Sequence, residues 1–115
     1  MATELWSYRS DIAAPPRQLA GFEVNASDGH IGSIDDATFE VGSAYIVVDT
    51  GFWIFGKRRM IPAGAISEID LDAETVTIAR TKDEVKNAPD YDEVRAEEEA
   101  YRDEMDTYWG QWPMM

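Results

Sequence analysis

Residues 44–62 place the tightest limits on how this chain can fold. An apolar run, Tyr45–Val48, ends at an Asp-Thr-Gly turn, and a second apolar run, Phe52–Phe55, follows it. The second run breaks at Gly56 and resumes as Lys57–Ile61 before a proline closes it. Short apolar runs bounded by glycine, proline and aspartate are typical of the strands of a small barrel or sandwich.

The segment upstream predicts strongly curved strands. Asp28-Gly29 is a hairpin turn signal, and a long strand is expected to follow over His30–Val41. The apolar residues later in this strand fall at every second position, which places them on one face. Ile31 belongs to the same series of positions, whereas Ile34 does not. We therefore expect a bulge or glycine kink near Gly32–Ile34, as a tightly curled strand needs.

Two further strands are expected downstream, one holding Ile66 and Ile69 and the other holding Val76 and Ile78. A polar turn, Asp-Leu-Asp-Ala-Glu, lies between them. The chain is thus predicted to be mainly β, a small barrel of five or six strands. Strands that curl on themselves leave few free edges for aggregation.

Two helices are expected after the strands. Thr81 and Glu84 have the spacing of a capping box, which predicts a short helix ending near Pro89. The segment Tyr91–Trp109 carries apolar residues at 91, 94, 101, 105 and 108 on an acidic background, with Glu98 in the remaining position of the stripe. This spacing predicts an amphipathic helix.

These patterns divide the chain into three parts. Residues 1–20 are predicted to be an irregular N-terminal arm, residues 21–90 the barrel, and residues 91–115 an acidic amphipathic helix with an aromatic tail. The helix has three possible docking places: its own barrel, the arm through Trp6 and Tyr8, or a second copy of the chain.

Charge and composition limit the classes of partner. Aspartate and glutamate outnumber lysine and arginine by 23 to 10, which gives a net charge of −13. Such a surface repels phosphate backbones, so nucleic acid is not the expected partner. The sequence has no cysteine, no secretion signal and no apolar run long enough to span a membrane. We expect a bacterial cytoplasmic protein.

Catalytic signals are weak. His30 is the one histidine, and it stands beside a tight turn where surface residues are common. Asp35 and Asp36 point to opposite faces of a strand, and the acids at 70, 72 and 74 fit a solvated hairpin tip. No nucleophile motif or phosphate loop is present. The prediction is a protein that is not an enzyme, with no catalytic residue, metal or cofactor.

A basic triplet is the first candidate binding patch. Lys57, Arg58 and Arg59 follow the aromatic residues Trp53 and Phe55. Aromatic and cationic side chains in neighbouring positions can bind phosphate or RNA. The alternative is that these cations pair with carboxylates of the same chain, and the net charge favours this alternative.

The tail is the second candidate. Tyr101, Met105, Tyr108 and Trp109 share one helical face, and Trp112 lies just beyond. Aromatic and methionine side chains are frequent at binding hot spots. The same residues would equally serve to dock the helix on its own barrel.

Four segments resemble the PRC-barrel family, which is named after the cytoplasmic part of the photosynthetic reaction centre H subunit. They are Asp28–Gly32, Val47–Gly51, Trp53–Gly56 and Thr81–Pro89. The resemblance covers roughly residues 21–90 and is nearest to the small free-standing bacterial members. It implies the barrel fold and brings no catalytic residue. Members of the family also include the 16S rRNA maturation factor, which binds a ribosomal protein.

We therefore expect a non-enzymatic interaction or adaptor module with an unidentified protein partner. The sequence leaves open whether the chain forms a homo-oligomer. One alternative is an accessory factor in ribosome or RNA maturation, and another is a peripheral accessory of a membrane electron-transfer complex.

Overall fold

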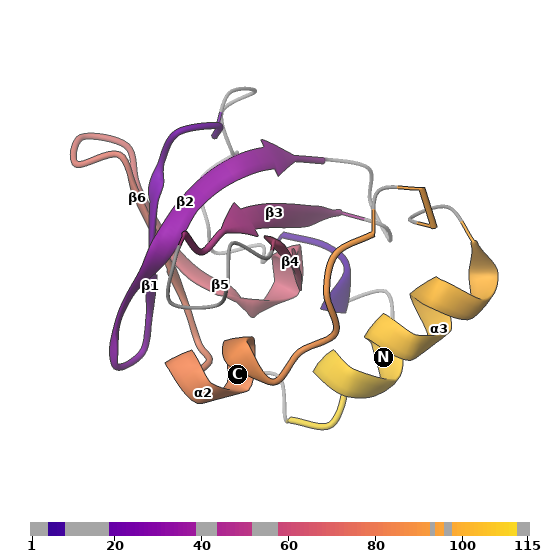
Figure 1. The fold of residues 1–115 in the computed structure, drawn as a ribbon. Coiled ribbons are helices and arrows are strands. Elements are labelled where there is room, and N and C mark those ends of the chain that lie inside the picture. The colour runs from indigo at the N-terminus through magenta and orange to yellow at the C-terminus, as the bar shows by residue number, and fades with distance from the viewer. Residues whose placement is uncertain are drawn as a thin grey trace.

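A curled, six-stranded sheet forms the body of the molecule (Figure 1). The computed structural model describes residues 5–8, 19–38, 44–51, 58–92, 94–95 and 98–112. The strands lie in the order β4-β3-β2-β1-β6-β5. Only β1 and β6 pair in parallel, and the other neighbours are antiparallel. The strands are β1 (Glu23–Ala26), β2 (Gly29–Ala37), β3 (Tyr45–Asp49), β4 (Arg58–Pro62), β5 (Ile66–Asp70) and β6 (Thr75–Ile78).

The β1–β2 hairpin turns as the sequence predicts, and β2 changes its inward face. Ile31 and Ile34 are both buried although they are three positions apart. The register of β2 against β3 shifts between Ile34 and Asp36, which confirms the expected irregularity. At Gly32 the backbone has a φ of +156°, and a Cβ there would lie 2.1 Å from the Asp49 carbonyl oxygen. The glycine therefore lets β3 approach β2 closely.

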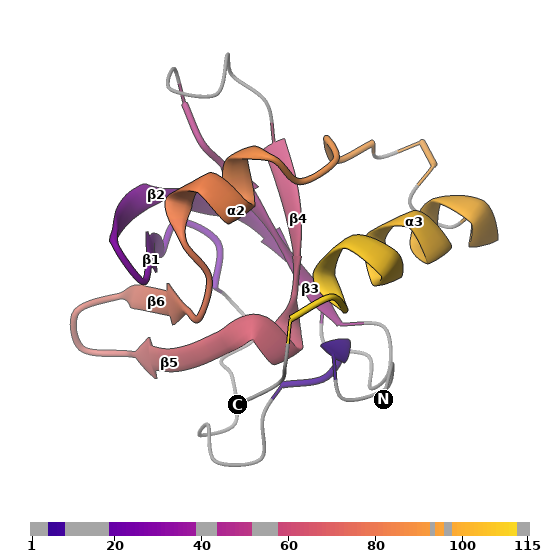
Figure 2. The ribbon, with the colours of Figure 1, turned by 90° about the horizontal axis from the view of Figure 1, so that it is seen from below.

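Strand β3, which pairs with β2 and β4, is buried along its length apart from its last residue. Every residue of Tyr45–Val48 is buried, so both faces of this strand are covered. A short 3₁₀ helix, η1 (Ala63–Ala65), turns the chain from β4 into β5, so the edge strands of the sheet meet at a corner (Figure 2). The β5–β6 hairpin follows, with Val76 and Ile78 pointing into the core. The sheet thus closes around its apolar face.

Helix α2 (Lys82–Lys86) begins with the predicted capping box. The Glu84 amide donates to the Thr81 hydroxyl at 3.2 Å, and the Thr81 amide donates to the Glu84 carboxylate at 2.8 Å. Val85 is the buried residue of this helix. The Lys82 amide also donates to the Asp28 carboxylate at 2.8 Å, which ties the helix to the β1–β2 turn.

Helix α3 spans Glu99–Trp109, so the prediction that it begins at Tyr91 is wrong. The Tyr91 amide donates to the Arg58 carbonyl at 2.9 Å, which keeps the chain extended along β4. The amide of Val94 donates to the Asp92 carboxylate and forms a local turn. Val94 is 88% exposed and does not extend the apolar stripe of the helix.

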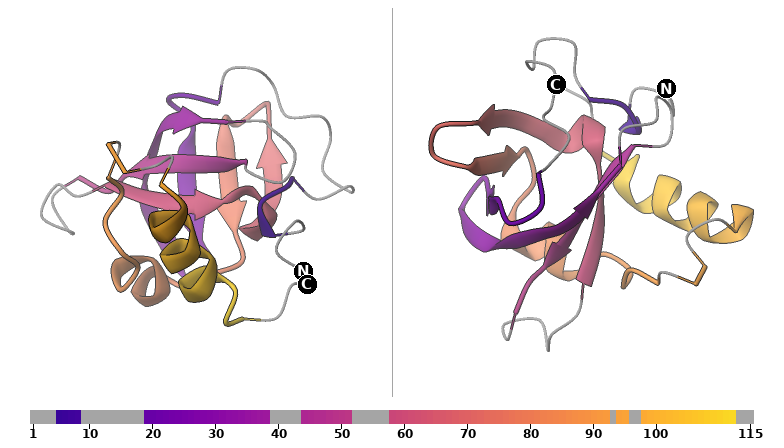
Figure 3. Two further views of the ribbon diagram at one scale, coloured as in Figure 1. Left: turned by 90° about the vertical axis from the view of Figure 1, so that its right-hand side faces the viewer. Right: turned by 90° about the horizontal axis from the view of Figure 1, so that it is seen from above.

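The N-terminal segment contributes to the core. Leu5 and Trp6 are buried, and the Trp6 indole N–H donates to the Asp106 carboxylate of α3 at 3.0 Å. The guanidinium of Arg102 lies 4.6 Å from the centre of the Trp6 ring. Both α2 and α3 lie on one side of the sheet (Figure 3). The predicted fold class, mainly β with a C-terminal helix, is confirmed, whereas the predicted arm is part of the core at Leu5 and Trp6.

Candidate functional site

The two arginines of the predicted basic patch have different roles. Arg59 is buried, and its Nε and Nη2 donate to the carbonyls of Val85 and Lys86, each at 3.1 Å. Its Nη1 forms an ion pair with Asp90 at 2.5 Å. These contacts neutralise the C-terminal end of α2. Arg59 therefore holds the fold together, which corrects its prediction as a binding residue.

Arg58 is half-exposed but also has partners in its own chain. Its Nη1 lies 2.9 Å from the Asp35 carboxylate, and its guanidinium lies 5.4 Å from the centre of the Tyr91 ring. The alternative interpretation, that these cations pair within the chain, accounts for both arginines. The other predicted members of the patch, Trp53, Phe55 and Lys57, lie outside the described residues.

Three of the predicted tail residues belong to the core. The side chains of Tyr101, Met105 and Trp109 are at most 1% exposed. The Tyr101 hydroxyl donates to the Asp90 carbonyl at 3.0 Å. Burial raises the pKa of Tyr101, with further contributions from the nearby Asp92 and Glu104 carboxylates. These three residues of the predicted binding face are covered by the chain itself, so they are not available to a partner or to a second copy in this fold.

Tyr108 and Trp112 are the predicted tail residues that stay partly exposed. The Tyr108 hydroxyl donates to the Glu84 carbonyl of α2, and burial is the main cause of its raised pKa. The centre of the Trp112 ring lies 5.2 Å from that of Tyr108 and 5.2 Å from the guanidinium of Arg80. Both rings are thus fixed in place by neighbours in the chain.

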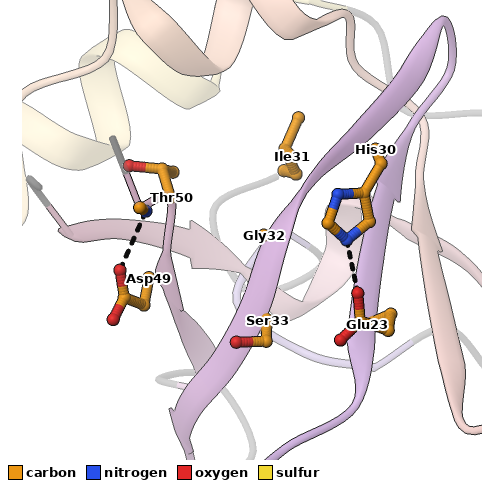
Figure 4. Close-up of a pocket in the computed structure, with 8 residues that line it drawn as sticks. Glu23, His30, Ile31, Gly32, Ser33, Asp49 and Thr50 are labelled. Carbon is orange, nitrogen blue, oxygen red and sulfur yellow. Dashed lines mark hydrogen bonds and ion pairs between the residues drawn. The ribbon is translucent and has the colours of Figure 1, made fainter. Parts of the chain in front are cut away.

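A first hollow lies where β1, β2 and the end of β3 meet (Figure 4). It has a volume of about 350 Å³. The Glu23 carboxylate and His30 Nε2 are 2.5 Å apart, and both side chains are more than half exposed. The Asp49 carboxylate accepts the Gly51 amide at 2.9 Å. Each carboxylate of this hollow is therefore already in use.

The Glu23–His30 pair resembles part of a general-base arrangement. In the described part of the chain, however, no hydroxyl is hydrogen-bonded to the other nitrogen of His30, so the pair lacks the activated nucleophile of a hydrolytic triad. The sequence pattern did not bring Glu23 and His30 together. Because the register shifts between Val24 and Asn25, the distance along the two strands could not be counted from the sequence.

A second, shallow hollow of about 640 Å³ follows one face of α3, and we name it the α3 groove. Its lining residues on the helix recur every three or four positions, so they form one continuous stripe. Pro89 forms the facing wall. The lining consists of Pro89, Ala100, Asp103, Glu104, Thr107, Tyr108 and Gln111.

The carboxylates of this groove differ from those of the first hollow. Asp103 and Glu104 are exposed, and within the described residues neither side chain forms a hydrogen bond or an ion pair. The Gln111 side chain donates back to the Tyr108 carbonyl at 2.8 Å. The α3 groove thus presents negative charge that no described residue neutralises through a hydrogen bond or an ion pair.

The described arginines all contact groups of their own chain. Besides Arg58 and Arg59, the guanidinium of Arg80 stacks on Trp112, that of Arg95 on Tyr101, and that of Arg102 on Trp6 and Tyr45. Cations held over aromatic rings and carboxylates contribute little to a surface that attracts polyanions. The excess acidic residues are left to dominate the outer surface.

Within the residues that the structure describes, no three histidine, cysteine or acidic side chains come together in a way that could hold a metal ion. Asp70, which the sequence offered as one of a turn cluster, accepts the amides of Asp72 and Ala73 at 3.0 Å each. Among the described helices, none has the length and apolarity to cross a membrane.

Comparisons with known proteins bear on the fold. No family model matches the chain, and no curated protein matches it. A solved structure of a protein described as the 16S ribosomal RNA processing protein RimM, from Pseudomonas aeruginosa, is similar with a TM-score of 0.50 and 22% identity. The match covers 65% of this chain and 49% of the RimM chain, so it spans about half of that structure. This similarity supports a PRC-barrel-like fold.

Proposed function

We propose that this chain is a non-enzymatic protein-interaction module and that the α3 groove is its binding surface. The observation that carries the proposal is the division of α3 into two faces. One face is filled by the chain's own core, and the other holds Asp103 and Glu104 without partners in the described part of the chain. An acidic helix face beside Pro89, packed on the barrel, suits recognition better than chemistry.

We also infer that the chain belongs to the PRC-barrel family. The motifs at Asp28–Gly32 and Val47–Gly51 and the likeness to RimM support this inference. In this fold the first motif supplies the hairpin and the close approach at Gly32. Both are structural roles, in keeping with a binding surface on α3 and not on these motifs.

Site-specific photocrosslinking tests the proposal. A photoreactive amino acid replaces Thr107 in the full chain, which is then illuminated in a lysate of the source cells with and without nuclease. The matched control carries the same amino acid at Leu71, which is 52% exposed in the β5–β6 turn, on the far side of the molecule from α3 (Figure 2). We expect a discrete protein adduct from position 107 that withstands nuclease and is missing from position 71.

Two results would refute the interaction module at this groove. Equal adducts from both positions would mean that contact is random, and no protein adduct from position 107 would mean that the groove is unoccupied. Turnover of a small substrate, abolished by changing His30 or Glu23, would separately show that the chain is an enzyme.

A second function, an accessory role in ribosome or RNA maturation, is supported by the structural likeness to RimM. Its predicted RNA-facing residue Arg58 is half-exposed beside Asp35, so any contact with phosphate must compete with that carboxylate. Crosslinked RNA, or ribosomal proteins whose adducts vanish with nuclease, would favour this function. The same crosslinking experiment therefore separates the two.

A further inference from the structure

We propose that the α3 groove receives a lysine- and arginine-rich segment of its partner protein. This inference rests on the proposed function, because it names the chemistry of the partner at the same surface. The expected occupant of the groove is a cationic polypeptide, and not a nucleic acid or an anionic membrane.

The charge of the groove is the first argument. None of the residues that line it is a lysine or an arginine, whereas Asp103 and Glu104 both face it. The arginine nearest in sequence, Arg102, has its guanidinium over the Trp6 and Tyr45 rings at 4.6 and 5.5 Å. The helix therefore directs its own cation towards the core side and leaves its acidic pair for an outside cation.

The shape of the groove is the second argument. Ala100 and Thr107 are small, and they lie one helical turn before and after the acidic pair. Small side chains at these positions let a partner backbone come close to the helix. Lysine and arginine side chains are long enough to reach Asp103 and Glu104 from such a backbone.

The floor of the groove adds a site for the apolar part of a cationic side chain. Tyr108 lines it, with its hydroxyl held by the Glu84 carbonyl and its ring 5.1 Å, centre to centre, from that of Trp109. A ring fixed in this way loses little entropy on binding. It can pack against a lysine or arginine stem or attract its charge.

The overall charge selects the class of partner. With a net charge of −13, the chain repels polyanions at long range and attracts cationic segments. A basic polypeptide is therefore steered towards the surface and then held at the α3 groove, whose carboxylates lack partners among the described residues.

Fluorescence anisotropy on the full chain tests the inference. The probe is a short labelled peptide in which lysine and arginine alternate with alanine and leucine, and the matched probe replaces each cation by glutamate. A labelled RNA oligonucleotide is the third probe. Of the three probes, we expect only the cationic peptide to bind. Its affinity should fall as salt is added, because screening shortens the range of the attraction between the charges.

Charge-reversal variants locate the binding. The groove variant is Asp103→Lys with Glu104→Lys, and the control is Glu68→Lys with Asp72→Lys, which makes the same change of net charge on the exposed β5–β6 hairpin. The groove variant should weaken binding by about tenfold or more and the control by about threefold or less. A second groove variant, Asp103→Asn with Glu104→Gln, removes charge without adding any and should fall between the two.

The outcomes separate the inference from the proposed function. Equal losses in the groove variant and the control, or equal binding of the two peptides, would overturn the inference even if position 107 crosslinks to a cellular protein. Tight binding of the RNA probe would also overturn it. Conversely, groove-dependent binding of the cationic peptide with no cellular adduct at position 107 would support the groove chemistry and refute the proposed function.

Discussion

The two faces of helix α3 differ in the kind of side chain that they carry and in what covers it. On one face, Tyr101, Met105 and Trp109 are buried against the sheet and the N-terminal segment. On the other, Asp103 and Glu104 lie in the groove without partners among the described residues. The difference teaches that aromatic content alone does not identify a binding surface, because the chain's own core takes up Tyr101 and Trp109.

Truncation on the core face should have the largest effect. Trp109→Ala removes the largest fully buried side chain and should lower the free energy of unfolding by about 3–5 kcal/mol. Thr107→Ala, two positions away on the groove face, should change it by less than about 0.5 kcal/mol. Urea unfolding of both variants measures the contrast, and similar losses would mean that the two faces are not distinct.

The two neighbouring arginines of β4 should also differ in how much stability their replacement costs, with losses smaller than that expected for Trp109→Ala. Arg59→Ala leaves the carbonyls at the end of α2 without their donor and should cost about 2–3 kcal/mol. Arg58→Ala breaks an exposed ion pair with Asp35 and should cost less than about 1 kcal/mol. Thermal unfolding monitored by circular dichroism compares them, and an equal shift in Tm would contradict the assignment of Arg59 to the fold.

Alkaline pH should loosen the N-terminal side of the core. Burial raises the pKa of Tyr8 to about 12 from an ordinary 10.0, and its hydroxyl donates to the Thr38 carbonyl at 2.9 Å. Because the folded state holds this proton more tightly, the stabilisation is complete below pH 10 and is lost as the pH rises towards 12. The advantage of the natural chain over Tyr8→Phe, about 1 kcal/mol near neutrality, should therefore shrink across that range. A constant difference would argue against the raised pKa of the Tyr8 hydroxyl.

The smallest effect on stability is expected for the groove carboxylates. Asp103→Asn with Glu104→Gln should leave the free energy of unfolding within about 0.5 kcal/mol, since neither side chain has a partner to lose in the described structure. Denaturant titration at low and high salt provides the measurement. A marked loss of stability would show that the pair supports the fold and would weaken its assignment to a partner.

The elements that depend on local sequence were predicted well. The capping box at Thr81 and Glu84 and the loss of alternation between Ile31 and Ile34 both appear where expected. These features follow from hydrogen bonds and periodicities that span only a few residues. They needed no knowledge of distant parts of the chain.

The start of α3 and the role of Arg59 depend on contacts far apart in the sequence. Tyr91 pairs with β4 through a backbone hydrogen bond, which keeps it out of the helix although its spacing matches the apolar stripe. Arg59 looked like a surface cation because the sequence does not show that α2 ends above it. The α3 groove was missed for a related reason, since Pro89 meets the helix only after the chain has turned back.

The hydrogen bond between Trp6 and Asp106 joins residues that are 100 positions apart. During synthesis at about 5–20 residues per second, Trp6 must wait roughly 5–20 s before its partner exists. For that time the indole lacks its native acceptor on α3, although the Trp6 carbonyl can already accept the Ala44 amide. All six strands precede α3 in the chain, so the N-terminal segment makes its contact with this helix only after the whole barrel has been synthesised.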